Sequence, residues 1–236
     1  MTQIPIETSY GICSSGADFI KHILSQRGLC SIDTDTPGRL FERTVTLIQK
    51  ELSALDVCGT LLSMAVVFAC FFLVCMVSEH VMKHPMGIVS RIFLSLTGAY
   101  ALFMTELALI SREADSRDGI FVSSMFSSSL TELEKIYVFL NVLFFVPFGL
   151  FLAAGLYGEV RGIKSVMLTI LVCSIFTFFI ECTQRATGRG YFEVADIEAN
   201  ILGGIFGSLP GIAIGAAFQA KTKKKKNRKR QRTAGQ

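Results

Sequence analysis

The stretch that decides the fold is VCGTLLSMAVVFACFFLVCMV, Val57 to Val77, which contains no charged residue. A helix needs roughly 20 predominantly apolar residues to cross the hydrocarbon core of a bilayer. This stretch reaches that length on its own. It therefore predicts a membrane-spanning helix.

Four further apolar blocks follow along the chain, at approximately Ile88–Ile110, Ile136–Leu156, Ile163–Ile180 and Asp196–Phe218. The chain of 236 residues is 51% hydrophobic and only 18% charged, and its mean hydropathy is +0.51. A soluble domain carries nearer ~25% charged residues and does not arrange its apolar residues in such long runs. The predicted fold class is an all-α, polytopic transmembrane bundle of about five helices.

The chain divides into four parts, at residues 1–55, 56–87, 88–218 and 219–236. The first part is polar and is too short to bury much of a core, so we expect an interfacial helix from about Leu40 to Ala54 rather than a catalytic domain. The second holds one transmembrane helix and a loop, the third holds four spans, and the fourth is a polybasic tail. Cys13 and Cys30 could form a disulfide if the first part is extracellular.

Basic residues set the expected orientation, because short cytoplasmic loops carry an excess of lysine and arginine. Nine of the 23 basic residues lie in the tail, between Lys221 and Arg232. Five spans place the tail, Arg161, Lys164, Lys83 and Arg91 on the cytoplasmic side. The N-terminus and the acidic loop after the second block then face outward. We expect a multi-pass cell-membrane protein whose tail binds anionic lipid rather than nucleic acid.

Polar residues within the apolar blocks indicate a site, because ionisable groups are costly in hydrocarbon and usually face the interior of a bundle. They are Glu106, Asn141, Glu181, Gln184, Asp196 and Asn200. With alternating helix directions, all six fall at one level, just below the outer surface. The alternative is that they are hydrogen-bonding residues that hold the helices together and bind nothing.

A ladder of glycines continues the face of the last block that carries Asp196 and Asn200. Its members are Gly203, Gly204, Gly207, Gly211 and Gly215. Small residues at this spacing let two transmembrane helices approach closely. We therefore expect the polar pair to lie at the top of a buried helix–helix seam.

Two strings in this order resemble the VanZ-like family of bacterial membrane proteins. The first is NVLFFVPFG, from Asn141 to Gly149, which contains Pro147. The second begins with ECTQ at Glu181, runs through TGRGYFE and Asp196, and ends in NILGG and Gly207. Ser111-Arg112-Glu113 matches a basic residue that often follows the first helix of the family. The resemblance covers about Ile88 to Phe218 and leaves the first block as an addition.

Ala195 departs from the family pattern, because many members carry a second aspartate there beside the one that matches Asp196. Glu193 could substitute for it. With the residues of both strings included, the candidate ligand-binding residues are Glu106, Arg112, Asn141, Glu181, Gln184, Arg189, Glu193, Asp196 and Asn200. The candidate helix-packing residues are Pro147, Gly149, Gly203, Gly204, Gly207 and Gly211.

The resemblance implies a cell-envelope protein, because the name-giving member is associated with resistance to the glycopeptide teicoplanin. We expect a binding or accessory protein that engages a lipid-linked or cell-wall ligand at the outer rim. The alternatives are an intramembrane enzyme that uses carboxylates, as an acid/base pair or with Mg²⁺ or Ca²⁺, and a small transporter. No cofactor or metal site is predicted, and His22, His80 and His84 all lie outside the site region.

Overall fold

The computed structural model describes residues 42, 44–46, 48–49, 55–82, 86–110, 119–128, 130–160 and 162–234. All the helices and strands named below belong to the unit Thr44–Gln236. Within the expected interfacial helix, the described residues 42, 44–46 and 48–49 are helical. The rest of the polar N-terminal part, with Cys13 and Cys30, and Arg112 lie outside the described residues.

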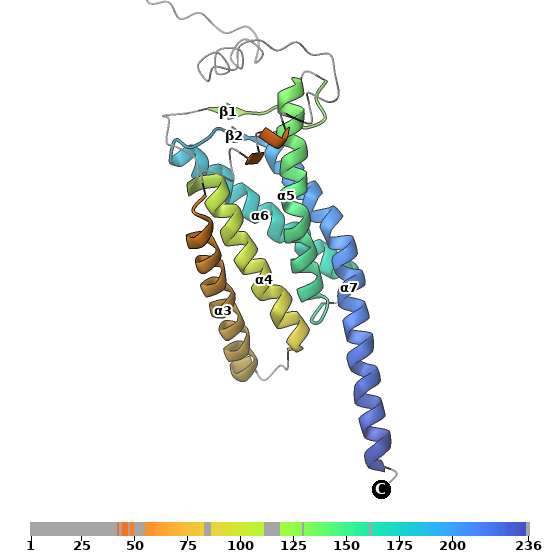
Figure 1. Ribbon diagram of the computed structural model, residues 1–236. Helices are drawn as coiled ribbons and strands as arrows, with labels where there is room; N and C mark the ends of the chain where they lie inside the picture. The colour runs from red at the N-terminus through yellow and green to blue at the C-terminus, as the bar shows by residue number, and fades with distance from the viewer. Residues whose placement is uncertain are drawn as a thin grey trace, which may run out of the picture. The chain divides into compact units, whose positions relative to one another are not determined.

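In the described part of the chain, five helices are long and apolar enough to cross a membrane, which confirms the predicted fold class. They are labelled in Figure 1 as α3 (Val57–Met82), α4 (Ile88–Thr105), α5 (Glu132–Leu156), α6 (Ile163–Ala186) and α7 (Val194–Ala234). Three short elements accompany them: a π-helix, η1 (Glu106–Ile110), and the strands β1 (Ile120–Phe121) and β2 (Phe192–Glu193).

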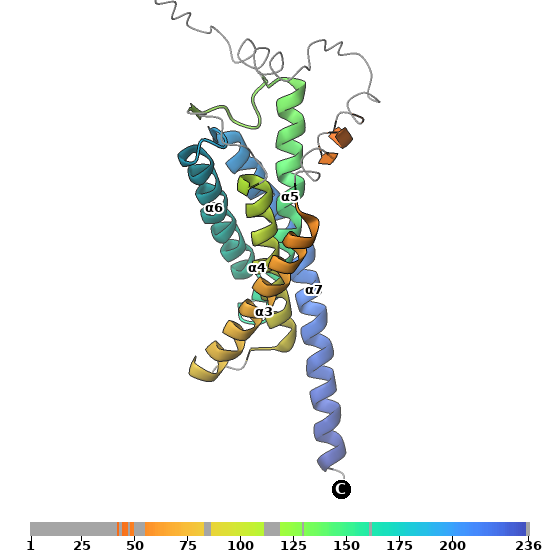
Figure 2. The same ribbon diagram turned by 60° about the vertical axis from the view of Figure 1, so that its left-hand side comes forward.

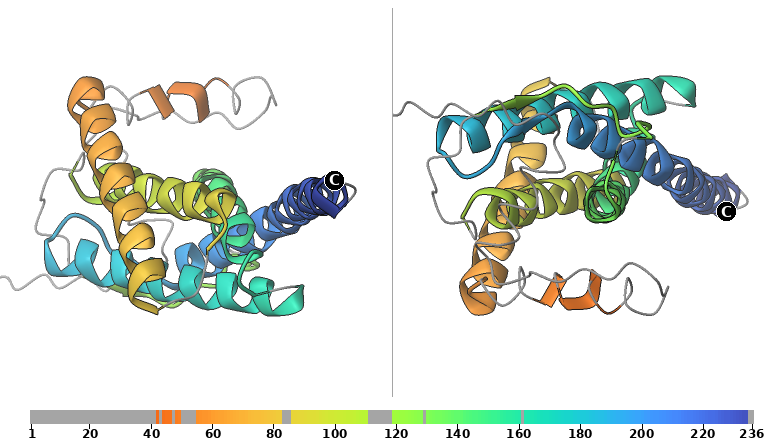
Figure 3. Two further views of the ribbon diagram at one scale, coloured as in Figure 1. Left: turned by 90° about the horizontal axis from the view of Figure 1, so that it is seen from below. Right: turned by 90° about the horizontal axis from the view of Figure 1, so that it is seen from above.

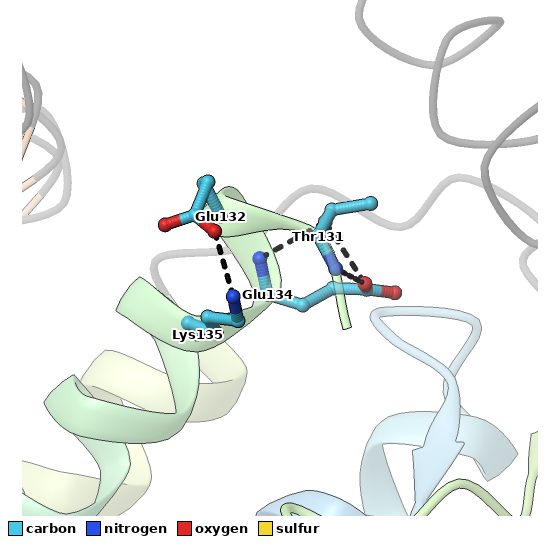
Figure 4. Close-up of polar contacts among 4 residues, drawn as sticks. All are labelled: Thr131, Glu132, Glu134 and Lys135. Atoms are coloured by element: carbon cyan, nitrogen blue, oxygen red, sulfur yellow. Dashed lines mark hydrogen bonds and ion pairs between the residues drawn. The ribbon is translucent and has the colours of Figure 1, made fainter. Parts of the chain in front are cut away.

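Helix α5 begins four residues before the predicted apolar block, and a capping box explains this. The side chain of Thr131 accepts a hydrogen bond from the backbone N–H of Glu134, and the Glu134 carboxylate accepts one from the backbone N–H of Thr131 (2.6 Å). These bonds satisfy donors that a helix start otherwise leaves without partners. Lys135 also pairs with Glu132 at 2.6 Å (Figure 4).

Helix α7 is much longer than the block that predicted it. It runs through the basic tail and extends beyond the ends of the other helices (Figure 1). At 1.5 Å per residue, 41 helical residues span about 60 Å, roughly twice the thickness of a hydrocarbon core. Only part of α7 can therefore lie within a bilayer.

The helices pack in a consistent order around the pair formed by α5 and α7. Helix α6 packs against α7, α4 packs against α5, and α3 packs against α4. The two views along the bundle in Figure 3 show α5 and α7 side by side, and Figure 2 shows α3 crossing α4. The buried apolar cluster lies among α4, α5 and α6 and contains Met104, Phe145, Phe148, Leu152, Cys173 and Ile180.

Glycines of α7 lie directly against the backbone of α5. A Cβ atom built on Gly203 would overlap the carbonyl oxygen of Val142, and one on Gly207 would overlap that of Val146. On the α5 side, a Cβ on Gly149 would lie 2.8 Å from the Cα of Gly204. At this seam the two helices can approach so closely only because side chains are absent.

The glycine ladder serves two neighbours rather than one. Gly203, Gly207 and Gly211 face α5, whereas a Cβ on Gly204 would lie 2.5 Å from the Sγ atom of Cys173 in α6. Consecutive residues of a helix point about 100° apart, so the Cβ positions of Gly203 and Gly204 face different helices. Helix α7 is therefore closely packed on two sides.

Two short strands join loops that are far apart in the sequence. Strand β1 pairs in parallel with β2, so that Phe121 lies opposite Glu193 (Figure 1). The Glu198 carboxylate of α7 accepts hydrogen bonds from the Ser124 hydroxyl (2.7 Å) and the Met125 N–H (2.9 Å). The described part of the loop before α5 is thereby fixed at the end of the bundle where α6 ends and α7 begins.

Candidate functional site

A cavity of about 110 Å³ lies among the ends of α4, α5, α6 and α7, with η1 as part of its wall. It is large enough for several water molecules or a small ligand group. Five of the candidate ligand-binding residues line it: Asn141, Glu181, Gln184, Asp196 and Asn200. The remaining wall is mostly apolar and includes Tyr137, Leu140, Phe144 and Phe145 of α5 and Ile48.

The side-chain amide of Asn200 has a hydrogen-bond partner at its nitrogen but none at its oxygen among the described residues. Its amide nitrogen donates to the hydroxyl of Thr177 in α6 at 2.7 Å. The residue is only 5% exposed, yet its carbonyl oxygen has no hydrogen-bond partner among the described residues. A buried acceptor without a partner costs free energy, on the order of 1–3 kcal/mol. Such a group in the wall of a cavity is the feature expected of a site that receives a donor.

Glu181 is 2% exposed and is held by the segment that leads into α7. One of its carboxylate oxygens accepts a hydrogen bond from the backbone N–H of Glu193 at 3.1 Å. Glu193 thus contributes its main chain to the site, and β2 fixes the position of that N–H. The pairing of β2 with β1 links the Glu181 carboxylate to the loop before α5.

Two candidate residues donate hydrogen bonds to backbone carbonyl oxygens of η1, which forms part of the cavity wall. The side-chain nitrogen of Gln184 donates to the carbonyl oxygen of Ala108 at 3.1 Å. The guanidinium group of Arg189 donates to the carbonyl oxygen of Leu109. A π-helix is rare and is frequently found at functional sites, where its wider turn changes the direction of the following side chains. Here Leu107 and Ala108 of that turn line the cavity.

The sequence predicts Glu106 at the same level as the residues of the cavity wall, but Glu106 does not line the cavity. One of its carboxylate oxygens accepts a hydrogen bond from the Ser63 hydroxyl of α3 at 2.8 Å. The other oxygen is buried and has no hydrogen-bond partner in the described part of the chain. Glu106 therefore connects the end of α4 to α3, on a different side from the other carboxylates.

Sequence reasoning missed Thr177, which orients Asn200 and is fully buried. A signal for it was present in α6, where small or polar residues recur at a spacing of four and all face the interior. These are Ser165, Thr169, Cys173, Thr177 and Glu181. Such a stripe predicts the buried face of a transmembrane helix, and Thr177 lies on it one turn before Glu181.

The polar lining presents both hydrogen-bond acceptors and donors, and the side-chain amide of Asn141 supplies one group of each kind. Glu181, Asp196 and Asn200 supply acceptor oxygens, while the Gln184 amide nitrogen is bonded to η1. In the described part of the chain, no group of three or more His, Cys, Asp or Glu side chains is arranged to hold a metal ion. The Asn200 oxygen, which has no hydrogen-bond partner among the described residues, favours a ligand group that donates a hydrogen bond.

Comparison with known proteins gives one family, while no curated protein and no solved structure matches significantly. The model of this family, described as VanZ/LLP1, matches residues 60–214. The match begins within α3, earlier than the Ile88 at which the resemblance was placed, and ends within α7. It covers well over half of the chain and includes every residue of the cavity wall except Ile48. The protein built around this cavity is therefore a multi-pass membrane protein of the VanZ/LLP1 family.

Proposed function

We propose that this protein binds a lipid-linked or cell-wall ligand in the cavity, as an accessory protein of the cell envelope. The observation that carries the proposal is the buried carbonyl oxygen of Asn200, which has no hydrogen-bond partner in the described part of the chain and lies in a wall shared with Glu181 and Asp196. Residues that only hold helices together mostly satisfy each other's hydrogen bonds. Glu106 also has an oxygen without a partner among the described residues, but it does not line the cavity. An unsatisfied acceptor beside an open volume is better explained by a bound partner.

The apolar part of the wall supports a ligand with a lipid portion. Tyr137, Phe144 and Phe145 contribute aromatic rings of α5 to a lining that also holds polar residues of α5, α6 and α7. Ligand sites commonly combine an apolar wall with a few polar groups that fix orientation. An amphipathic molecule with a polar head and an apolar chain satisfies both parts of this wall.

The proposal includes an orientation in which the cavity lies near the outer surface and the basic tail lies in the cytoplasm. The excess of lysine and arginine in the tail supports it. Anionic lipid of the cytoplasmic leaflet would attract the tail where α7 leaves the bilayer, near Lys221. In cells that carry a single cysteine, an impermeant thiol reagent should label position 13 and not Thr222→Cys. Labelling at Thr222 from outside would reverse the orientation.

The test of function removes the negative charges without changing the shape of the cavity. We expect the Glu181→Gln, Asp196→Asn double variant to reach normal membrane abundance and to lose activity. The assay is glycopeptide or envelope-stress sensitivity in a deletion strain that expresses the variant. Gln219→Leu, which changes an amide of α7 far from the cavity, is the matched control and should complement fully. Full complementation by the double variant would leave these residues with a packing role alone.

A further inference from the structure

Residues 119–128, which we call the β1 segment, carry large apolar side chains that the protein leaves uncovered. Phe126 is 80% exposed, Val122 is 77% exposed, and Ile120 is also exposed. The sequence of the segment is GIFVSSMFSS, which contains no charged residue. Contiguous apolar exposure of this kind marks a surface that contacts another protein or a membrane.

The exposure of these side chains is a property of the fold, because the backbone of the β1 segment is fixed. Strand β1 pairs with β2, and the Glu198 carboxylate accepts hydrogen bonds from the Ser124 hydroxyl and the Met125 N–H. The Phe126 N–H donates to the Ser124 hydroxyl oxygen at 3.3 Å. The polar groups of this turn are thus bonded to α7 and to each other, and the Phe126 ring is left on the outside.

The contacts of β2 indicate the depth at which the β1 segment lies. The Phe192 ring packs against the Phe178 ring of α6, with 5.9 Å between their centroids. Phe178 lies about two turns before α6 ends at Ala186, which is about 12 Å along the helix axis. The 24 residues of α6 are about 36 Å long, so the helix exceeds a hydrocarbon core of roughly 30 Å by only a few ångström at each end. The two rings therefore meet within the apolar layer of the bilayer.

This contact lies on the outer surface of the bundle. Phe178 is still 55% exposed, and the neighbouring Phe179 is exposed as well. Ile120 is the strand partner of Phe192, so the β1 segment lies directly beside the strand that touches α6. Exposed apolar residues of a membrane-spanning helix face lipid, and the exposed side chains of the β1 segment continue that surface.

We propose that the β1 segment is an interfacial wedge that inserts Val122 and Phe126 among the phospholipids of the leaflet at this end of the bundle. Phospholipid is the partner that fits, because the segment is apolar, uncharged and continuous with the lipid-facing surface of α6. Apolar side chains of interfacial segments are typically buried about 5–10 Å into the boundary between head groups and acyl chains. The inference does not depend on which ligand enters the cavity.

The wedge is connected to the cavity through a single strand. Glu193 of β2 lies opposite Phe121 of β1 and donates its backbone N–H to Glu181 in the cavity wall. Insertion of the β1 segment therefore holds this part of the wall at the level of the leaflet.

The test uses tryptophan fluorescence, because the chain contains no tryptophan of its own. Full-length Phe126→Trp is reconstituted in phosphatidylcholine nanodiscs, which leave both faces of the bilayer open to iodide. In one sample, part of the lipid carries bromine near the glycerol end of its acyl chains. Bromine quenches a tryptophan that contacts lipid, and iodide quenches one that contacts water. We expect strong quenching by the brominated lipid and weak quenching by iodide.

Two control variants give the limits of both signals. Phe179→Trp, on the exposed face of α6, should be quenched by the brominated lipid. Glu132→Trp, in the exposed first turn of α5, should be quenched by iodide. Phe126→Trp should resemble Phe179→Trp in both measurements.

Val122→Trp is a second probe, which keeps the test decisive if Phe126→Trp does not fold, and it should give the same result. Iodide quenching of either probe as strong as that of Glu132→Trp would overturn the proposal, because the segment would then lie in water. Protection of the probes from both quenchers would also overturn it. A second copy of the protein or another part of the chain would then cover the segment in place of lipid.

Discussion

Two helix contacts in this protein both use glycine, and they differ in what the glycine meets. At the seam between α5 and α7, glycines of one helix meet backbone atoms of the other, such as the carbonyl oxygen of Val146 opposite Gly207. Between α3 and α4, a Cβ on Gly98 would lie 2.7 Å from the ring of Phe71. One contact joins main chain to main chain, and the other joins main chain to a side chain.

The difference determines which parts of the cavity wall can adjust. A ring can rotate or shift within its rotamer wells, but a carbonyl oxygen in a helix cannot move without moving the helix. The α5 and α7 sides of the cavity are therefore held at a fixed separation by the seam. Helix α3 has strongly exposed outer residues such as Leu62 (68%). Its contact with α4 involves a side chain that can move.

The largest effect is expected from Gly207→Leu. The new side chain would overlap Val146 and force α5 and α7 apart, at a cost of ~3 kcal/mol or more. We expect little folded protein in detergent, measured by size-exclusion chromatography and thermal unfolding. Ala213→Leu, at an exposed position of the same helix, is the control and should behave like the wild type. Similar melting temperatures for the two variants would mean that the seam is not rigid.

A smaller effect is expected from Gly98→Ala. The added methyl group would lie 2.7 Å from the Phe71 ring, which must shift until ordinary contact is restored. Because a side chain rather than the main chain has to move, the cost should be ~1 kcal/mol. Thermal unfolding should show a modest shift while ligand binding at the cavity is kept. Leu62→Ala, on the exposed side of α3, should change the unfolding free energy by no more than about 0.5 kcal/mol. Loss of folded protein in Gly98→Ala would mean that the α3–α4 contact tolerates added volume no better than the α5–α7 seam does.

The five spans could be predicted because hydrocarbon imposes a length and a composition on every helix that crosses it. The start of α5 was harder to predict, because Glu132 and Glu134 interrupt the apolar pattern while the capping box extends the helix. The long α7 was also missed at its basic end, where the apolar signal stops at about Phe218 but the helix continues to Ala234.

From the sequence, the candidate residues could be predicted to lie at one depth, but the direction in which each side chain points could not be predicted. Asn141, Glu181 and Asn200 share one cavity, as their common depth suggested. Glu106 was expected beside them, and the structure turns it toward Ser63 instead. Residue spacing assumes 3.6 residues per turn, and η1 departs from that period beginning at Glu106. No residue pattern in the sequence predicts this π-helix.

One further consequence follows from the continuity of α7. The same helix carries Asp196 and Asn200 at one end and the lysine-rich segment at the other, with no loop between them. Pro210 lies between these ends, where its missing N–H removes one hydrogen bond of the helix. Helix α7 nevertheless continues without a break from Val194 to Ala234. A change in the tilt of α7 at the cavity would therefore displace its basic end.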